Sequence, residues 1–359
     1  MTSETAFRAI DLLADSSKNK EDVAVTFYGG EPILQFPLIR SCVEYSLKKL
    51  RQKKHIAFSI TTNGTLITQA MAEFFALHGF SLVVSIDGPK DVHDEHRADP
   101  SGKGSFDKSI LGLKKLFDAY GPDYEKLSLS MVFAPPYSIE KMDKICQLWA
   151  EIKWLPKSIR VSITYPMGYI EKGNEPYEEE RQFDTSLLSW VNKEFIDAYK
   201  NGNRSFPIAA HAVEKKLTQI FRRPIYEKSS DKFNLNACCI PGGRKLFVSA
   251  SGELQICERI LDSPVLGDVD NGINFEIIKR VYFDEYAKLS YTTCSKCWAG
   301  RLCNICYMHA YRNKRFDSEM KARNCESARH MVENSLKLYC SLLEINDKGL
   351  DYLEDYVIS

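Results

Sequence analysis

The first 166 residues alternate between strand-like and helix-like segments, and this alternation restricts the fold more than any other feature. Helical patterns separate five short apolar runs, which we expect to be strands: 22–28, 55–64, 81–88, 127–133 and 158–166. Near-continuous apolar strands that alternate with helices are typical of a parallel sheet covered by helices. The sequence therefore predicts an α/β fold.

Three of these runs end in unusual polar motifs. The sequence reads "GGEP" at 29–32, "TTNG" at 61–64 and "SIDGP" at 85–89. The catalytic and ligand-binding residues of α/β barrels lie where strands end and loops begin. The coincidence of three such endings predicts a ligand site at this edge of the sheet.

Composition restricts the class of protein. The chain is 44% apolar and 27% charged, and its 48 basic residues equal its 48 acidic residues. This balance does not favour a nucleic acid or an acidic membrane as a partner. The sequence shows no apolar run of about 18 residues, as a membrane helix needs, and no secretory signal at its start. We therefore expect a cytoplasmic location.

Cysteines concentrate in the last third of the chain. Only Cys42 and Cys146 precede residue 238, and their helical spacing suggests small apolar residues on helix faces. Thiols stay reduced in the cytoplasm, so clustered cysteines indicate metal ligands rather than disulfides. Zinc and iron–sulfur clusters both accept four thiolates, and spacing alone leaves both open. The candidate ligands are Cys239, Cys257, Cys294, Cys297, Cys303, Cys306 and Cys325.

The cysteine spacing resembles a known family. The pattern C-x12-G-x4-C from Cys239, followed by C-x2-C-x5-C-x2-C from Cys294 and then Cys325, resembles the SPASM domain of radical S-adenosylmethionine (SAM) enzymes that modify peptides and proteins. The last spacing in the cluster is two residues, where the family usually has three. Independently, "FYGGEP" at 27–32 resembles the radical SAM glycine-glycine-glutamate motif. The resemblance covers about residues 1 to 332.

The resemblance implies an incomplete radical SAM (β/α)6 partial barrel followed by a small SPASM domain. The implied domains are a partial barrel at 1–178, a helical connection at 179–235, a SPASM auxiliary-cluster domain at 236–332, and a C-terminal helix and tail at 333–359.

The resemblance also implies the cofactors: SAM and two auxiliary [4Fe–4S] clusters. Cys294, Cys297, Cys303 and Cys325 would hold the second cluster, and Cys239, Cys257 and Cys306 the first, whose fourth ligand is open. The expected SAM-binding residues are Gly29, Gly30, Glu31, Asn63, Ser85 and Arg97. Two glycines let a backbone approach a ligand closely, and Glu31 would accept from the SAM amino group. The alternatives are a plain turn at Asn63, a strand hydroxyl at Ser85 and a surface ion pair at Arg97.

Glu258 follows Cys257 directly and is the candidate catalytic residue. Sulfatase-maturing relatives have an aspartate at this place, so the resemblance implies a general base beside a cluster. The alternative is an exposed residue at a hairpin end, paired with Arg259 or Arg244.

The 359 residues contain no CxxxCxxC, the motif that holds the SAM-cleaving cluster in this family. We therefore expect the chain to be an N-terminally truncated and inactive form, with the primary [4Fe–4S] cluster only in a full-length parent. A fragment or misassigned gene start is the favoured explanation. A truncated pseudogene product and a genuine short protein are the alternatives.

The implied function is maturation of a ribosomally made peptide or protein, through hydrogen abstraction by a 5′-deoxyadenosyl radical, with a thioether or carbon–carbon crosslink as product. One alternative is an anaerobic sulfatase maturase, which forms formylglycine. Another is a non-catalytic iron–sulfur or zinc module that binds a peptide. The expected partners are the peptide or protein substrate and a reducing electron-transfer protein, with no nucleic acid and no membrane.

Overall fold

The computed structural model describes residues 1–50, 54–164, 185–202, 208–225, 239–260 and 263–355. The chain divides into two compact units, each assembled from several segments. One contains residues 1–23, 37–56 and 219–340, and is called the cysteine unit here. The other contains residues 24–36, 57–218 and 341–359, and is called the sheet unit because most of the central sheet belongs to it.

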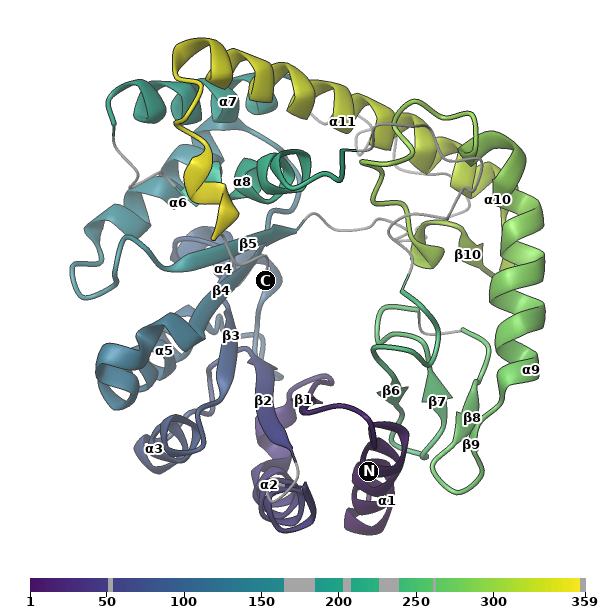
Figure 1. Cartoon of the computed structure of the whole chain (residues 1–359). Coiled ribbons are helices and arrows are strands. Elements are labelled where there is room, and N and C mark those ends of the chain that lie inside the picture. The colour runs from purple at the N-terminus through teal and green to yellow at the C-terminus, as the bar shows by residue number, and fades with distance from the viewer. Residues whose placement is uncertain (51–53, 165–184, 203–207, 226–238, 261–262, 356–359) are drawn as a thin grey trace. The chain divides into compact units, whose positions relative to one another are not determined.

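A five-stranded sheet in the order β1-β2-β3-β4-β5 forms the framework of the fold (Figure 1). Strands β2 to β5 pair in parallel, which confirms the predicted α/β class. The strands are β1 (Asp22–Phe27), β2 (His55–Thr62), β3 (Ser81–Ser85), β4 (Leu127–Val132) and β5 (Arg160–Thr164). Each matches one of the five predicted runs, although residues 165–166 of the last run lie outside the described residues.

Helices follow the strands in the sheet unit: α3 (Gln69–Leu77), α4 (Lys90–His96), α5 (Phe106–Tyr120), α6 (Ile139–Glu151), α7 (Thr185–Lys200) and α8 (Ile208–Phe221). Side-chain caps fix two of their starts. Thr68 accepts from the backbone N–H of Met71, and Ser138 accepts from that of Lys141. Such caps stabilise a helix by about 1 kcal/mol each.

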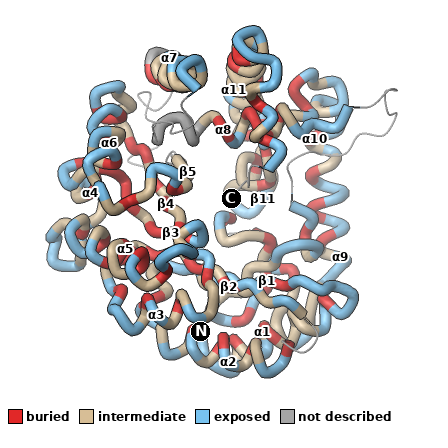
Figure 2. Tube along the Cα trace, turned by 60° about the vertical axis from the view of Figure 1, so that its left-hand side comes forward, coloured by how far each residue is buried: buried red, intermediate tan, exposed pale blue. Residues whose placement is uncertain are grey.

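Alternate residues along the strands of the sheet unit are buried, as the red segments of Figure 2 show. Leu82, Val84 and Leu129 have no exposed surface, and Phe75 and Phe80 fill the space beside them. The Phe75 and Phe80 rings meet edge to face with centroids 4.9 Å apart. This core holds the carboxyl ends of neighbouring strands in a fixed position.

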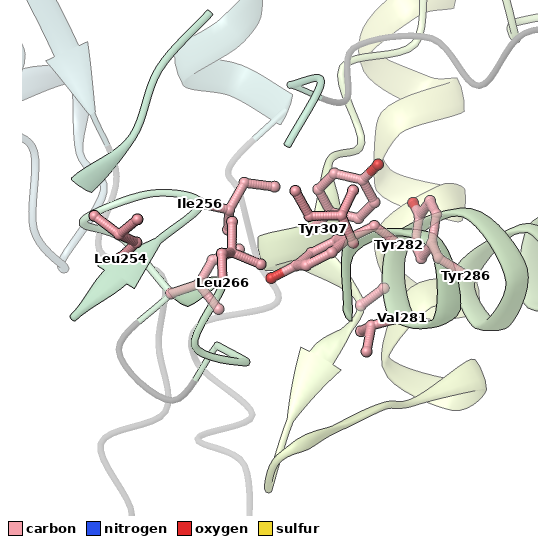
Figure 3. Packing of buried hydrophobic residues seen from close by; sticks show 10 residues of the cluster. Leu254, Ile256, Leu266, Val281, Tyr282, Tyr286 and Tyr307 are labelled. Carbon is pink, nitrogen blue, oxygen red and sulfur yellow. The ribbon is translucent and has the colours of Figure 1, made fainter. Parts of the chain in front are cut away.

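The cysteine unit has its own apolar core (Figure 3), built on two short hairpins and a helical segment. The hairpins pair β6 (Phe247–Val248) with β7 (Leu254–Gln255), and β8 (Gly267–Asp268) with β9 (Gly272–Ile273). The helical segment consists of α9 (Phe275–Ile277), a π-helical stretch (Ile278–Glu285) and α10 (Tyr286–Cys294). Tyr282, Tyr286 and Tyr307 pack edge to face within this core.

Three longer helices complete the cysteine unit or extend from it: α1 (Ser3–Ser16), α2 (Phe36–Leu50) and α11 (Ser318–Ile345). The Phe7 ring of α1 stacks on Tyr45 of α2, and Arg8 forms an ion pair with Asp270. A two-residue hairpin, β10 (Tyr311–Arg312) with β11 (Arg315–Phe316), precedes α11. Cys42 is buried on α2, and burial raises the pKa of its thiol to about 11, as expected of a packing cysteine.

The predicted domain limits stay predictions. Those near 178 and 235 lie outside the described residues, and α11 runs without a break across the limit at 332. Within the described residues, every helix is too short or too polar to cross a lipid bilayer.

Candidate functional site

The Glu31 carboxylate links the carboxyl ends of β1 and β2. Its Oε1 atom accepts from the Thr62 hydroxyl at 2.7 Å and from the Ile33 backbone N–H at 3.1 Å. Its Oε2 atom accepts from the Asn63 backbone N–H at 2.8 Å. A carboxylate offers about four acceptor positions, so one acceptor position remains for a further donor. The three protein bonds fix the orientation of the carboxylate.

Gly29 and Gly30 precede Glu31 and leave open space beside the backbone. A Cβ atom added at either glycine would meet no other atom within 4 Å. The glycines are therefore not required by packing within the protein. Their open side suits the close approach of a ligand to the backbone.

Asn63 and Ser85 occupy the ends of the next two strands. The Asn63 side-chain oxygen accepts from the backbone N–H and the hydroxyl of Thr65, at 2.9 and 2.7 Å. This is the turn geometry that was the alternative for Asn63. Ser85 ends β3 beside Ser130 and is half-buried.

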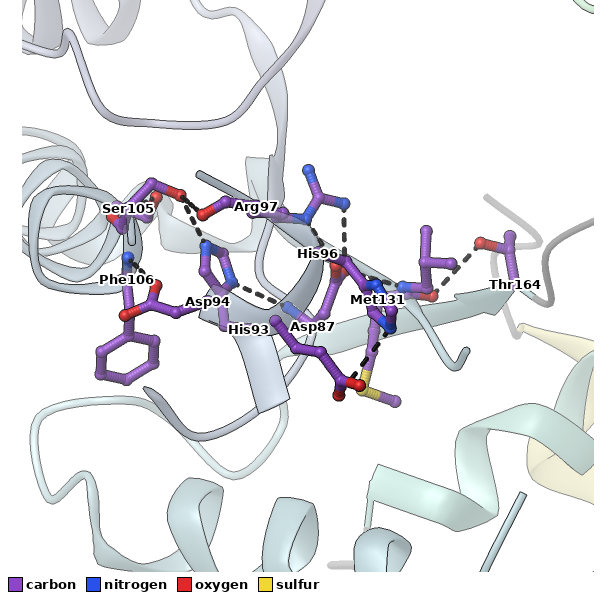
Figure 4. A network of polar contacts seen from close by, with 12 residues as sticks. Asp87, His93, Asp94, His96, Arg97, Ser105, Phe106, Met131 and Thr164 are labelled. Carbon is purple, nitrogen blue, oxygen red and sulfur yellow. Dashed lines mark hydrogen bonds and ion pairs between the residues drawn. The ribbon is translucent and has the colours of Figure 1, made fainter. Parts of the chain in front are cut away.

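Arg97 forms a two-pronged ion pair with Asp87 (Figure 4). Its Nε and Nη2 atoms lie 2.5 and 3.0 Å from the two carboxylate oxygens. The Asp87 side chain is only 5% exposed and also accepts from the backbone N–H of Val132. The alternative role of Arg97 was a surface ion pair. Arg97 does form an ion pair, but its partner Asp87 is buried.

The same network extends to His93 and Ser105. The Asp87 backbone N–H donates to Nδ1 of His93 at 3.2 Å, and Nε2 of His93 lies 3.0 Å from the Ser105 hydroxyl. That hydroxyl donates to the carbonyl of Arg97 at 2.9 Å. These bonds tie the end of β3 to α4 and to the start of α5. They hold the Arg97 backbone in place as well as its side chain.

Replacing Asp87 by asparagine is expected to lower the free energy of unfolding by about 3 kcal/mol, because it leaves the Arg97 charge without its buried partner. Urea unfolding at pH 7.5 measures the change. Asp107→Asn is the matched control, since Asp107 pairs with Lys90 on the surface and such pairs contribute at most about 1 kcal/mol. Equal losses in the two variants would contradict the buried-pair account.

The His93 network also predicts a pH dependence. His93 has no exposed surface, and burial lowers its pKa. The folded protein thus keeps His93 neutral, so stability is full above the ordinary histidine pKa of about 6.5 and falls as pH drops below it. The slope from one proton is at most about 1.4 kcal/mol per pH unit. Between pH 7.5 and 5.5, the free energy of unfolding measured in urea should fall less in His93→Asn than in the unaltered protein. Equal falls in the two proteins would contradict this role of His93.

Four of the predicted ligands line one pocket in the cysteine unit: Cys294, Cys297, Cys303 and Cys325. Cys294 ends α10, the next two lie in the turns that follow, and Cys325 lies on α11. Lys321 and Arg329 line the same pocket, together with Tyr286, Thr293, Ala299, Gly300, Ile305 and Ala328. This is the set of four that the resemblance assigned to the second cluster.

The donor set of this pocket fits an iron–sulfur cluster. Four thiolates are the usual ligands of such clusters. Structural zinc ions also take four thiolates, about 2.3 Å from each sulfur, so the donor set fits both kinds of centre. The backbone N–H of Ile305 donates to the Cys303 sulfur at 3.4 Å. Hydrogen bonds to ligand sulfurs are one means by which proteins tune such clusters.

The remaining candidate ligands are Cys239, Cys257 and Cys306. Burial raises the pKa of the Cys306 thiol, while backbone N–H groups of Met308 and His309 act to lower it. Nδ1 of His309 lies 3.4 Å from the Cys306 sulfur and accepts from the Cys306 backbone N–H. The Cys257 sulfur accepts from the Arg259 backbone N–H at 3.3 Å. Cys238 lies outside the described residues.

Glu258 lies next to Cys257 and forms an ion pair with Lys245. The Lys245 ammonium is 2.6 Å from Oε2 of Glu258, whose side chain is only 13% exposed. Burial acts to raise the pKa of Glu258, but its net pKa lies below the usual value because Lys245 stabilises the carboxylate. Glu258 is therefore a half-enclosed carboxylate, not the exposed hairpin-end residue of the alternative, and its partner is neither Arg259 nor Arg244.

Several residues with evident roles in these sites were not predicted. Thr62 stands in the quoted "TTNG" and Asp87 in "SIDGP", but their side-chain partners Glu31 and Arg97 are known only from the folded chain. Lys321 gave no signal, because a lysine four residues before a cysteine is common on any helix. The folded chain shows that the Lys321 ammonium, carried by α11, lies beside the Cys294 sulfur.

Comparison with known families identifies the domain in the N-terminal part of the chain. Residues 4–148 match the model of the radical SAM superfamily. The chain carries a radical SAM domain. This match spans β1 to β4 and the Glu31 and Arg97 networks, and it confirms the resemblance found in the sequence.

Relatives of this chain include anaerobic sulfatase-maturating enzymes. The cysteine-type enzyme of Clostridium perfringens is 26% identical over 313 residues, which are 86% of this chain and 80% of that enzyme. The serine-type enzyme of Bacteroides thetaiotaomicron is 32% identical over 126 residues, which are 35% of this chain and 30% of that enzyme. These two relatives are maturases, and the first of them is similar to this chain over most of its length.

A solved structure of anSMEcpe with bound AdoMet has a TM-score of 0.71 to this chain, with 23% identity over 99% of this chain and 89% of the other. A second structure, of anSMEcpe with AdoMet and a Cp18Cys peptide, has a TM-score of 0.68 at 20% identity, over 99% of this chain and 91% of the other. These similarities confirm the predicted radical SAM fold, and the C-terminal part of this chain is rich in cysteine.

Proposed function

We propose that the protein is a radical SAM maturase that modifies a peptide or a protein segment. The observation that carries the proposal is the pocket with four thiols in a chain whose front part is a radical SAM domain. Sulfatase-maturating relatives support this class, and the peptide in one similar structure supports a peptide substrate. A reducing electron-transfer protein is the further partner we propose.

The strand ends of the sheet unit are the proposed SAM site. The open side of Gly29 and Gly30 would admit the ligand, and the remaining acceptor position of Glu31 would take its amino group. Ser85 and Arg97 are proposed to hold polar groups of the ligand. Arg97 already pairs with Asp87, so it would use the part of its guanidinium that Asp87 leaves free. AdoMet bound in the similar structures supports this use of the fold.

The two cysteine sites are proposed to hold auxiliary [4Fe–4S] clusters, and the SAM-cleaving chemistry of the family would supply a 5′-deoxyadenosyl radical that takes a hydrogen from the substrate. The residues of this chain would bind and orient the peptide beside Glu258. Glu258 is proposed to accept the proton that the substrate loses, since Lys245 keeps it ionised at neutral pH. The one electron that remains on the substrate would pass to an auxiliary cluster, and the proposed product is a thioether or carbon–carbon crosslink.

Sulfatase maturation is the second candidate function, and the relatives in Clostridium and Bacteroides favour it. Glu258 favours the crosslinking function instead, because sulfatase-maturing relatives have an aspartate at this place. The two functions differ in their products. A crosslink removes hydrogen and joins two side chains, whereas formylglycine formation replaces the cysteine thiol or serine hydroxyl by an aldehyde.

The product of a cysteine-containing peptide tests the proposal. The experiment uses the chain extended to carry a CxxxCxxC motif, because we propose that the 359 residues do not cleave SAM without one. Mass spectrometry distinguishes a crosslinked peptide from one that reacts with an aldehyde reagent. A crosslink supports the first function and an aldehyde the second. SAM cleavage that leaves every tested peptide unchanged would contradict both peptide products, whereas absence of SAM cleavage in the extended chain would favour the non-catalytic module.

A further inference from the structure

One face of helix α11 lines the pocket with four thiols. Lys321, Cys325, Ala328 and Arg329 all contribute to its wall. Cys325, Ala328 and Arg329 follow Lys321 by four, seven and eight positions, which is the spacing of a single helical face. The helix therefore presents a ligand cysteine and two cations to the same enclosed space.

Lys321 is unusual among these residues because it is buried. It is only 4% exposed, and its ammonium lies 3.3 Å from the Cys294 sulfur. The ammonium also lies 6.0 Å from the centroid of the Tyr286 ring. Among the residues that the structure describes, no carboxylate forms an ion pair with Lys321. Its nearest candidate for a counter-charge is thus the sulfur of a predicted ligand.

A buried ammonium without an anion costs several kcal/mol. That cost is removed when the neighbouring thiols are ionised, as they are when they bind a metal centre. The remaining wall is mostly apolar, with Tyr286, Ala299 and Ile305 in it. Because apolar surroundings weaken the screening of charge, the attraction between Lys321 and a thiolate-bound centre should be strong.

We propose that Lys321 is the counter-cation of the second cysteine site, where it stabilises the reduced, more negative state of the bound cluster. This inference rests on the proposed function, since it takes the site to hold an iron–sulfur cluster. Reduction adds one negative charge, and a fixed positive charge nearby favours the state with more negative charge. Lys321 should therefore raise the reduction potential of that cluster and leave the other cluster unaffected.

The test is a potentiometric titration of the anaerobically reconstituted chain, followed by electron paramagnetic resonance. Lys321→Met removes the charge and keeps a long apolar side chain, whereas Lys321→Arg keeps the charge. Lys337→Met is the matched control, since Lys337 is on the same helix but is 70% exposed and pairs with Glu333. Iron content is measured in every variant, so the result does not depend on enzymatic activity.

One of the two cluster signals should shift to a lower potential in Lys321→Met, by about a tenfold change in the reduction equilibrium, which is about 59 mV for one electron. Lys321→Arg and Lys337→Met should keep the potential of the unaltered protein. Loss of one cluster in Lys321→Met but not in Lys321→Arg also supports the proposal. Unchanged potentials with full iron in Lys321→Met would overturn it, as would equal loss of iron in Lys321→Met and Lys321→Arg. Absence of iron from the unaltered protein would instead overturn the proposed function.

Discussion

Replacing Cys325 by alanine should reduce the iron of the reconstituted chain from about eight to about four atoms, because each [4Fe–4S] cluster needs its full set of thiolates. Cys325 lines the pocket with Cys294, Cys297 and Cys303, and α11 holds it there. Burial raises the pKa of its thiol, while Lys321 and Arg329 lower it. Iron analysis together with acid-labile sulfide measures the change.

Cys340→Ala is the matched control for this prediction. Cys340 lies fifteen positions further along α11, is exposed and is outside the pocket. Its replacement should leave about eight irons. Full iron content in Cys325→Ala would show that Cys325 is not a ligand, and the assignment of the second site would be wrong.

Replacing Glu258 by glutamine should slow product formation at least about a hundredfold, the lower end of what a general base contributes. Glutamine has nearly the same shape, but it lacks the charge that Lys245 stabilises and accepts no proton at neutral pH. The rate is measured in the chain extended with a CxxxCxxC motif, under single-turnover conditions with the peptide. Iron content should be unchanged, which separates loss of a base from loss of a cluster.

Glu253→Gln provides the control for Glu258, because Glu253 lies in the same segment of the cysteine unit, is exposed, and its carboxylate accepts from the Ser251 hydroxyl of its turn. It should leave the rate within about twofold, as expected for a surface substitution. A Glu258→Gln rate as high as that of the Glu253 variant would mean that Glu258 has no role in proton transfer.

The central sheet could be predicted from the sequence because its strands are short apolar runs bounded by glycine and polar residues. The runs at 81–85 and 127–132 are examples in which local pattern and tertiary packing agree. Helix α4 was missed, since "KDVHDEH" has few apolar residues and is held by the His93 and Arg97 bonds rather than by its own pattern. The helical segment at 275–294 was also missed, because its middle follows a π-helical spacing.

The candidate sites divide in the same way. Cys294, Cys297 and Cys303 are near one another in sequence, so one turn brings them together and their spacing predicts a shared site. Asp87 and Lys321 act through partners that only the folded chain brings near, so no spacing could reveal them. The pairing of Glu258 with Lys245 depends likewise on the fold of the segment that carries both residues.

The most direct test of the account is the metal content of the unaltered chain after anaerobic purification and reconstitution. We expect about eight irons with matching sulfide, as for two [4Fe–4S] clusters, and a brown protein. A colourless protein that carries zinc bound by four thiolates would contradict it.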